Sequence, residues 1–342
     1  MINLWIEFAI MAFLIIFSGT YLSKYGDVIS DKTGLGQALI GSILVALATS
    51  LPELVTSTTS SLVGAPNIAI GNVFGSNTFN LMILAVADLI HGYSNDEPIM
   101  LQMRYSNILS GLLGMLLAVV VTFSMLVGHL TNIRLGIMGI GFDSIIIILT
   151  YIFGIRLVWR YDKKNPLDKK EIREEELIEK ISLKKAAFGF FISAVIIVFA
   201  GIRLSITGDK IATMTGIDQS FIGSIMVAAA TSLPELVATI SAISIGAYNM
   251  ALGNVFGSNI FNMIIVFFAD AFYRDGYILA SVDFVHSLTS MIVLLMSTIA
   301  VIGIFYRSKR TAFNLKIGWD SFLIGVIYFV GVYLLFRLGI SI

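Results

Sequence analysis

The chain has 342 residues, of which 57% are hydrophobic and only 13% are charged. Soluble domains carry about 25% charged residues, so this composition excludes a soluble enzyme and indicates a membrane protein. The formal net charge is zero and cysteine is absent, which excludes a basic surface for nucleic acid, a disulfide framework and thiolate metal sites.

Ten apolar segments are long enough to cross a bilayer core, which takes roughly 20 helical residues. In chain order they cover 3–23, 37–62, 68–90, 104–127, 134–158, 185–206, 219–245, 250–273, 282–305 and 317–338. The second and the seventh are interrupted by proline and contain Ser, Thr and Glu. The sequence therefore predicts an all-α, polytopic membrane protein with ten transmembrane helices. Residues 1–159 form the first five-helix half and residues 186–342 form the second.

Residues 160–185 are clearly hydrophilic, with nine Lys or Arg and seven Asp or Glu. Such mixed charge is typical of a solvated linker. When the loops are assigned alternately to the two sides of the membrane, 17 of the 22 basic residues fall on the side of this linker. The positive-inside rule then predicts a cytoplasmic linker and extracellular termini. We expect the protein in the plasma membrane.

The two halves contain an internal repeat. Residues 41–88 align without a gap to residues 223–270, at a constant offset of 182, with 29 identities in 48 positions. The longest identical blocks are ATSLPELV at 48–55 and 230–237 and GNVFGSN at 71–77 and 253–259. Because each half has an odd number of spans, the two copies are expected to face opposite ways. Such inverted repeats are typical of transporters, with the binding site at the interface between the repeats.

Glu53 and Glu235 are matched across the repeat and lie deep inside apolar spans. A charged residue at that depth costs roughly 2.5–3.5 kcal/mol or more, and intramembrane carboxylates are usually functional. No Lys or Arg lies deep enough in a span to pair with them. Each glutamate is therefore either protonated and bonded to a neighbouring helix or neutralised by a bound cation, and one divalent cation between the two carboxylates would neutralise both.

Other oxygen ligands accompany each glutamate. Pro52 and Pro234 each remove a backbone N–H, which frees carbonyl oxygens around Thr49 and Thr231. Helical spacing places two sets of residues on one face each. These sets are Ala46, Thr49, Ser50 and Glu53 in the first half, and Ala228, Thr231, Ser232 and Glu235 in the second. Each half therefore offers a carboxylate, hydroxyl groups and free carbonyls on one stripe.

A second stripe in each half carries Asn and Ser at i, i+4 and i+8. Its residues are Asn72, Ser76 and Asn80, copied as Asn254, Ser258 and Asn262. These side chains either form hydrogen bonds between helices or bind a cation. All the candidate ligands are hard oxygens, which suits Ca²⁺ or Na⁺ and not copper or zinc. Asp88 and Asp270 also match but lie near span ends, where an exposed carboxylate costs little, so we expect them to be structural.

With both repeats written out, the chain resembles the calcium/cation antiporter superfamily, and specifically its sodium/calcium exchanger branch in a prokaryotic form. ATSLPEL followed by GNVFGSNTFN, and ATSLPEL followed by GNVFGSNIFN, are similar to the two alpha-repeats of that branch. The resemblance implies a ten-helix inverted-repeat fold that exchanges Ca²⁺ for Na⁺ by alternating access. It implies no enzyme activity and no cofactor, with the lipid bilayer and the two ions as partners and a monomer as the functional unit.

The resemblance also implies roles for single residues. Glu53 and Glu235 would be the main Ca²⁺ ligands and would also bind Na⁺. The carbonyls of Thr49 and Thr231 would complete the Ca²⁺ site. Flanking Na⁺ sites would use Ser50, Ser232, Ser76, Ser258 and the carbonyls of Ala46 and Ala228, while Asn80 and Asn262 would line the centre. Some relatives carry Asp at the position of Asn262, notably potassium-dependent exchangers, so Asn here favours potassium independence.

Several alternatives remain. The same fold could couple Ca²⁺ to H⁺ or require K⁺, or the carboxylates could line a cation channel. An intramembrane enzyme is disfavoured because the repeated Ser, Thr and Glu come without a histidine or lysine base. ATP as the energy source is disfavoured as well, because no phosphate-binding GxxxxGK[ST] loop is present and the 160–185 loop is too short for a nucleotide domain.

Overall fold

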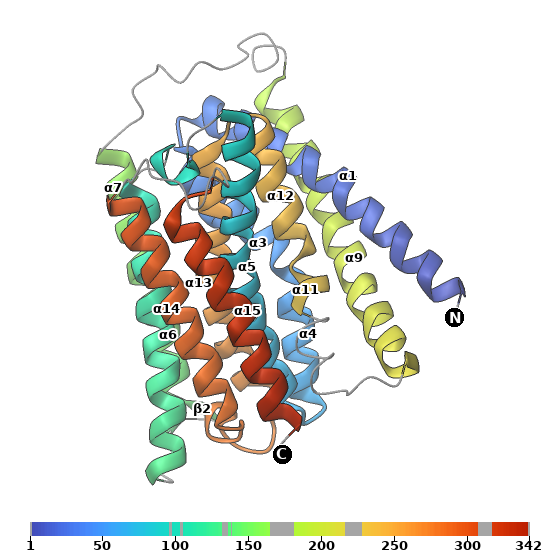
Figure 1. The fold of residues 1–342 in the computed structure, drawn as a ribbon, viewed down its shortest axis with the longest axis vertical. Helices are drawn as coiled ribbons and strands as arrows, with labels where there is room; N and C mark the ends of the chain where they lie inside the picture. Colours follow the sequence, from blue (N-terminus) through green and yellow to red (C-terminus); the bar gives the residue numbers. More distant parts are fainter. Residues whose placement is uncertain are drawn as a thin grey trace.

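The computed structural model of the chain describes residues 2–95, 98–102, 105–131, 136–137, 139–164, 181–215, 228–306 and 317–340. Within these residues, eight helices are long and apolar enough to cross a membrane, and a bent pair at 37–62 raises the number to nine. The helices are gathered in one bundle (Figure 1). The structure thus confirms a helical, multi-pass protein. The seventh predicted span lies partly on 219–227, outside the described residues.

The elements follow the two halves of the chain. The first half forms α1 (Ile2–Thr33), α2 (Gln37–Leu39), the π-helical turn η1 (Ile40–Val45), α3 (Ala46–Thr49), α4 (Leu51–Leu62), α5 (Pro66–Asn95), the short turn η2 (Ile99–Gln102), α6 (Tyr105–Thr131), the strands β1 (Gly136–Ile137) and β2 (Ile140–Gly141), and α7 (Phe142–Lys164). The second half forms α9 (Leu183–Thr215), α11 (Ala228–Thr231), α12 (Leu233–Ser244), α13 (Tyr248–Phe272), the short turn η4 (Ile278–Ala280), α14 (Val285–Tyr306) and α15 (Trp319–Ile340).

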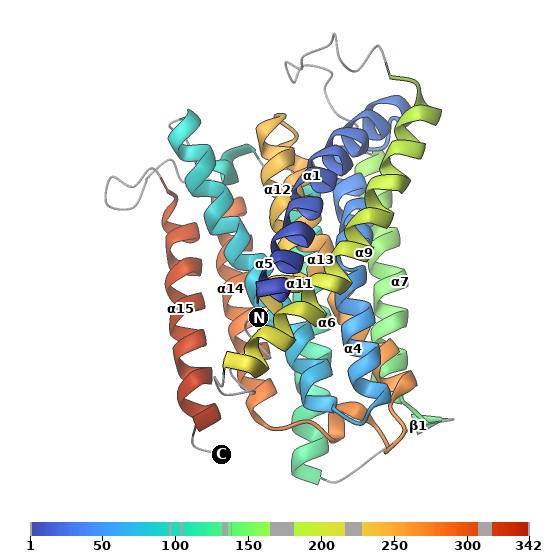
Figure 2. The same ribbon diagram turned by 90° about the vertical axis from the view of Figure 1, so that its right-hand side faces the viewer.

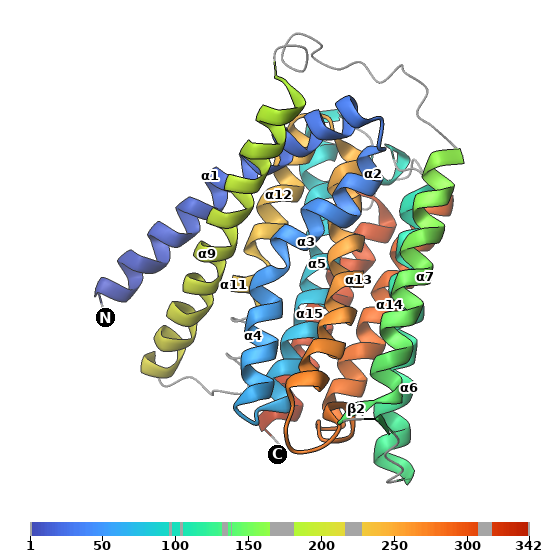
Figure 3. The same cartoon turned by 180° about the vertical axis from the view of Figure 1, so that it is seen from behind.

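The helices α5 and α13 form the centre of the bundle. They are the most buried of the long helices, and their small and polar residues face other helices rather than lipid. Helices α1 and α9 pack along each other and are tilted away from the remaining helices (Figures 1 and 3). The helices that end the two halves, α7 and α15, lie at opposite edges of the bundle (Figure 2).

The second predicted span is not one continuous helix. It consists of a segment from Gln37 to Thr49 and a second segment from Leu51 to Leu62, which meet at an angle of 47°. Pro52 explains the break, because a proline fits the first turn of a new helix but not a helix interior. The described part of the seventh span has the same form, with α11 ending at Thr231 and α12 beginning at Leu233.

Helices extend into both ends of the predicted linker, 160–185. Helix α7 continues to Lys164 and α9 begins at Leu183, since Lys and Arg are good helix formers. Residues 165–180 lie outside the described residues. The predicted span 134–158 includes a small antiparallel hairpin, in which Gly136 pairs with Gly141, and its helix begins only at Phe142.

The carboxylates of Asp88 and Asp270 are fully buried, not exposed as predicted. Asp88 accepts hydrogen bonds from the backbone N–H groups of Ile99 (2.6 Å) and Gly318 (2.7 Å). Asp270 accepts bonds from the backbone N–H groups of Ile278 (2.8 Å) and Gly141 (2.7 Å). Each aspartate therefore holds the start of the last helix of the other half. Their predicted structural role is confirmed, but they connect the halves rather than face solvent.

Candidate cation-binding site

The candidate site lies at the two helix breaks. Ser50 and Ser232 have backbone angles of φ −90°, ψ 8° and φ −86°, ψ 6°, which leave the helical region and separate the two segments. Glu53 and Glu235 then fall in the first turns of α4 and α12. A helix N-terminus has N–H groups without partners and a positive dipole end, so it stabilises a carboxylate there.

The carboxylates are hydrogen-bonded crosswise between the halves. The Ser50 hydroxyl donates to Oε1 of Glu235 at 2.8 Å, and the Ser232 hydroxyl donates to Oε1 of Glu53 at 3.0 Å. Within each half, Ser76 donates to Glu53 at 3.4 Å and Ser258 donates to Glu235 at 3.5 Å. Each Oε1 therefore has two serine donors, one from each half, and the two glutamates are held at one interface.

Asn72 and Asn254 each form hydrogen bonds with residues at both helix breaks. Nδ2 of Asn72 donates to the Glu53 carbonyl at 3.3 Å, and Nδ2 of Asn254 donates to the Glu235 carbonyl at 3.2 Å. Their Oδ1 atoms accept bonds from hydroxyls of the opposite half, Thr231 onto Asn72 at 3.4 Å and Thr49 onto Asn254 at 3.3 Å. Both asparagine side chains are thus engaged in bonds between helices, which was the alternative to cation binding at these two positions.

Several oxygens at the site have no hydrogen-bond donor. Among the described residues, Oε2 of Glu53, Oε2 of Glu235 and Oδ1 of Asn262 have no partner, and neither atom of the Asn80 amide has one. All four side chains are 0% exposed. A buried carboxylate oxygen without a donor is costly, and a bound cation removes that cost by coordinating it.

The arrangement suits a hard cation. The only ionisable groups at its centre are two carboxylates, and within the described part of the chain no Lys or Arg forms an ion pair with either of them. The surrounding groups are hydroxyl, amide and carbonyl oxygens, which Ca²⁺ and Na⁺ prefer. No group of three or more His, Asp or Glu side chains able to hold a metal occurs among the described residues.

The structure gathers the predicted ligands in one buried region, with none of them more than 3% exposed. They are Ala46, Thr49, Ser50, Glu53, Ser76, Asn80, Ala228, Thr231, Ser232, Glu235, Ser258 and Asn262. One detail of the prediction was wrong. The residues 46–53 and 228–235 do not lie on one continuous helix, because a break separates the serine from the glutamate. The structure adds a contact that the prediction did not specify, since each of these serines bonds the glutamate of the other half.

The carbonyls of Ala46 and Ala228 already have donors. The Ala46 oxygen accepts bonds from the Ser50 N–H at 2.9 Å and the Thr49 hydroxyl at 3.3 Å. The Ala228 oxygen accepts the equivalent bonds from Ser232 and Thr231. Because a carbonyl oxygen has two lone pairs, a cation at either position would have to replace one of these donors.

Sequence reasoning missed four buried polar residues around the site. Ser57 and Thr239 each bond the nearby asparagine amide at 3.0 Å, to Asn72 and Asn254 respectively. Asn77 and Asn259 bond each other's helix backbone. The repeat alignment contains Asn77 and Asn259 as identities, but they fall off the i, i+4, i+8 stripe and were therefore passed over.

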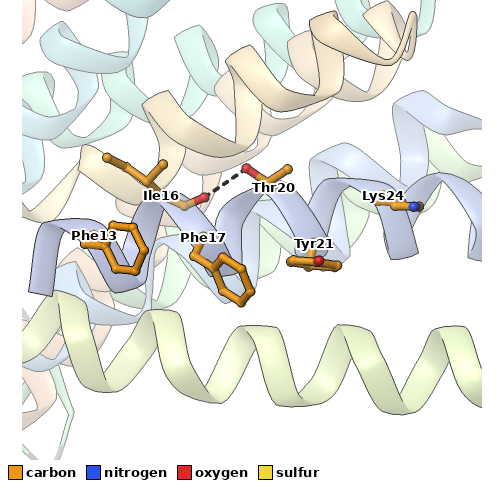
Figure 4. A pocket seen from close by; sticks show the side chains of 6 residues that line it. All are labelled: Phe13, Ile16, Phe17, Thr20, Tyr21 and Lys24. Carbon is orange, nitrogen blue, oxygen red and sulfur yellow. Dashed lines mark hydrogen bonds between the residues drawn. The ribbon is translucent and has the colours of Figure 1, made fainter. Parts of the chain in front are cut away.

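A separate hollow of about 420 Å³ opens on the surface of α1, lined by residues of that helix alone (Figure 4). Its lining is Phe13, Ile16, Phe17, Thr20, Tyr21 and Lys24, and Phe13 is 65% exposed. Its polar groups are one lysine and two hydroxyls, so it lacks the carboxylates that a cation site requires. Its apolar side chains are exposed, whereas the Thr20 hydroxyl lies 3.2 Å from that of Ser241 on α12.

The chain resembles known exchangers over most of its length. A family model described as sodium/calcium exchanger protein matches residues 3–160 and 185–338. The inner membrane protein YrbG of Escherichia coli is 27% identical over 267 residues, which cover 78% of each chain. Sodium/calcium exchanger MaX1 of Methanosarcina acetivorans is 28% identical over 271 residues, covering 72% of this chain and 76% of MaX1. A solved structure of the sodium-calcium exchanger NCX_Mj shares the fold, with a TM-score of 0.73 and 22% identity over 97% of this chain and 98% of that one.

The apolar helical bundle and the family match together define a membrane transporter, not an enzyme. Because the family model covers nearly the whole chain on both sides of the linker, the chain belongs to the sodium/calcium exchanger family. The resemblance drawn from the two repeated motifs is thereby confirmed.

Proposed function

We propose that the chain is a secondary antiporter that exchanges Ca²⁺ for Na⁺ across the membrane. The observation that carries this proposal is the pair of buried glutamates, each with one oxygen that lacks a hydrogen-bond donor among the described residues. Two carboxylates can be neutralised by one Ca²⁺ or by several Na⁺. The family match and the exchanger MaX1 among the relatives support the same pair of ions.

The proposed ligand roles combine oxygens that have no donor with oxygens at which a cation would replace a hydrogen-bond partner. Glu53 and Glu235 bind Ca²⁺ through their unpartnered Oε2 atoms, and the backbone carbonyls of Thr49 and Thr231 complete its shell. Na⁺ uses the same carboxylates together with the hydroxyls of Ser50, Ser232, Ser76 and Ser258 and the carbonyls of Ala46 and Ala228. Asn80 and Asn262 line the centre, where their amide oxygens are available.

Exchange without leak follows from the same charges. Carboxylates buried among helices are too costly to leave bare in a low-dielectric environment, so the protein changes its accessible side only when cations neutralise them. The two ions drive the change because each binds the two states with different affinity. The opposite directions of α5 and α13 in Figure 1 and the crosswise bonds related by the offset of 182 support an inverted repeat, and with it alternating access by two similar halves.

We place the protein in the plasma membrane as a monomer, with both termini extracellular and the 160–185 linker cytoplasmic. The orientation rests on the distribution of basic residues, 17 of which lie on one side of the predicted topology.

Purified protein in sealed vesicles tests the proposal. Uptake of ⁴⁵Ca²⁺ is measured with an outward gradient of Na⁺, H⁺ or K⁺ in turn, and we expect uptake with Na⁺ alone. Uptake driven by H⁺ while Na⁺ is inert would replace the proposal by H⁺ coupling, and a need for K⁺ would indicate a K⁺-dependent exchanger. Uptake that is independent of every gradient would indicate a channel. Glu53→Gln and Glu235→Gln should each abolish uptake while Ser61→Ala, a buried change that affects only a bond within α4, should not.

A further inference from the structure

Two asparagines bond reciprocally where α5 and α13 meet. Nδ2 of Asn77 donates to the backbone carbonyl of Asn259 at 3.4 Å, and Nδ2 of Asn259 donates to the backbone carbonyl of Asn77 at 3.5 Å. Both side chains are buried, with 1% and 5% exposed. The two residues occupy equivalent positions of the repeat, so the pair is symmetric in its backbone contacts.

These bonds fix which way each amide points. Because the nitrogen of Asn77 is committed to a carbonyl, its Oδ1 is the atom left to accept a bond. Nδ2 of Asn262 donates to that oxygen at 2.9 Å. The nitrogen of Asn262 is then committed as well, and its Oδ1 is left on the other side of the amide, buried and without a donor among the described residues. Asn262 lies one helical turn after Ser258, so it shares the face of α13 that bonds Glu235.

The equivalent chain of bonds is missing in the first half. Oδ1 of Asn259 has no partner within the described part of the molecule, and neither atom of the Asn80 amide has one. Asn80 is the repeat counterpart of Asn262, and both are 0% exposed. The symmetric pair of Asn77 and Asn259 therefore orients an amide on one side of the site only.

We propose that Asn77 is a positioning residue that holds Asn262 with its oxygen, rather than its NH₂ group, toward the transported cation. The proposal rests on the proposed function. An amide that turns over would present the positive N–H end to a cation, so a fixed orientation favours binding. Asn80 lacks such a partner, so its amide can turn. The site then has one amide oxygen of fixed orientation and one that can adapt to either Ca²⁺ or Na⁺.

The chain supplies a matched control for Asn77 in Asn259. Initial rates of Na⁺-driven ⁴⁵Ca²⁺ uptake into vesicles give KM for Ca²⁺ and kcat for each variant. The single variants are Asn77→Ala, Asn259→Ala, Asn262→Ala and Asn80→Ala. Two double variants combine Asn77→Ala with Asn262→Ala and Asn259→Ala with Asn80→Ala. We expect Asn77→Ala to raise KM roughly fivefold, the effect of one lost hydrogen bond, with little change in kcat. Asn259→Ala should change KM less than twofold, since its Oδ1 orients nothing.

Double variants distinguish an effect of Asn77 on the orientation of Asn262 from an effect on helix packing. In a background of Asn262→Ala, Asn77→Ala should add no further rise in KM, because the amide that it orients is gone. Adding Asn262→Asp to Asn77→Ala should restore KM, because a carboxylate presents oxygen in either orientation. If Asn77→Ala fails to fold, Asn77→Ser supplies the same comparison, since its short side chain cannot reach Asn262.

The outcomes distinguish this inference from the proposed function. Wild-type protein that takes up no Ca²⁺ with a Na⁺ gradient contradicts the proposed function itself. Active wild-type protein in which Asn77→Ala and Asn259→Ala raise KM equally overturns the positioning role. So does an effect of Asn77→Ala that persists unchanged in the Asn262→Ala background.

Discussion

The crosswise serine–glutamate bonds predict a specific pattern of energetic coupling. Ser50→Ala removes the 2.8 Å bond to Oε1 of Glu235 and leaves that oxygen with only the 3.5 Å bond from Ser258. A hydrogen bond to a charged group contributes about 1.5–3 kcal/mol to stability, so ion-free protein kept at an alkaline pH that ionises Glu235 should lose about that much. Ser61→Ala is the control, because its hydroxyl is equally buried but donates only to the carbonyl of Ser57 in its own helix.

A double-mutant cycle then identifies the partner of Ser50. When Glu235→Gln removes the charge, the remaining neutral bond is worth about 0.5–1.5 kcal/mol, so Ser50→Ala should cost roughly half as much in that background. In the Glu53→Gln background the cost should stay at its full value. The free energy of reversible unfolding is measured by denaturant titration in detergent, without Ca²⁺ or Na⁺. Coupling of Ser50 to Glu53 instead of Glu235, or a Ser50→Ala cost no larger than that of Ser61→Ala, would refute the crosswise arrangement.

Three further predictions use the same protein. Asp270→Asn should lower the unfolding midpoint far more than Asp275→Asn, because Asp270 is buried with backbone donors from two elements and Asp275 is exposed; equal shifts would contradict its role as a connection. Gly257→Ala should destabilise by about 1–3 kcal/mol because a methyl group there would collide with the backbone of Ser42. At Gly325 a methyl group would make only an ordinary contact with Sδ of Met82, at 4.0 Å, so Gly325→Ala should be neutral or stabilising. Because the chain has no cysteine, a single cysteine added at either terminus should react with a membrane-impermeant maleimide on intact cells, and labelling only after lysis would reverse the predicted topology.

The class of protein and the buried residues of the candidate site could be recognised from sequence because both leave local signals. Apolar stretches of about 20 residues define membrane helices whatever their neighbours are. Glu53 and Glu235 were identifiable because a carboxylate in an apolar span is costly and because the repeat marks both copies. The helix breaks were signalled by Pro52 and Pro234, although their geometry was not. The sequence suggested a distorted helix, whereas the chain ends one helix and starts another, which places each glutamate at a helix N-terminus.

The contacts between the halves could not be predicted, because no local pattern specifies which copy a side chain faces. Helical spacing placed Ser50 beside Glu53, yet Ser50 bonds Glu235 in the other half. The same holds for Asp88, which looked like an exposed residue at a span end and instead holds the backbone at Gly318. Such bonds depend on the way the two repeats are docked, and this information is distributed over all the helices that touch.

The alignment also treats the two halves as equivalent, and the structure shows where they are not. The serine bonds to the carboxylates have counterparts at an offset of 182, with distances that differ by 0.2 Å or less. Two contacts among the described residues lack such a counterpart. The Ser76 hydroxyl lies 3.4 Å from that of Thr231, and Asn262 is bonded to Asn77 while Asn80 is not bonded to Asn259. Under the alternating access that we propose, the two halves must differ in at least one contact in each state, because a fully symmetric arrangement would open both sides equally. The asparagines at the centre are one place where the described structure breaks that symmetry.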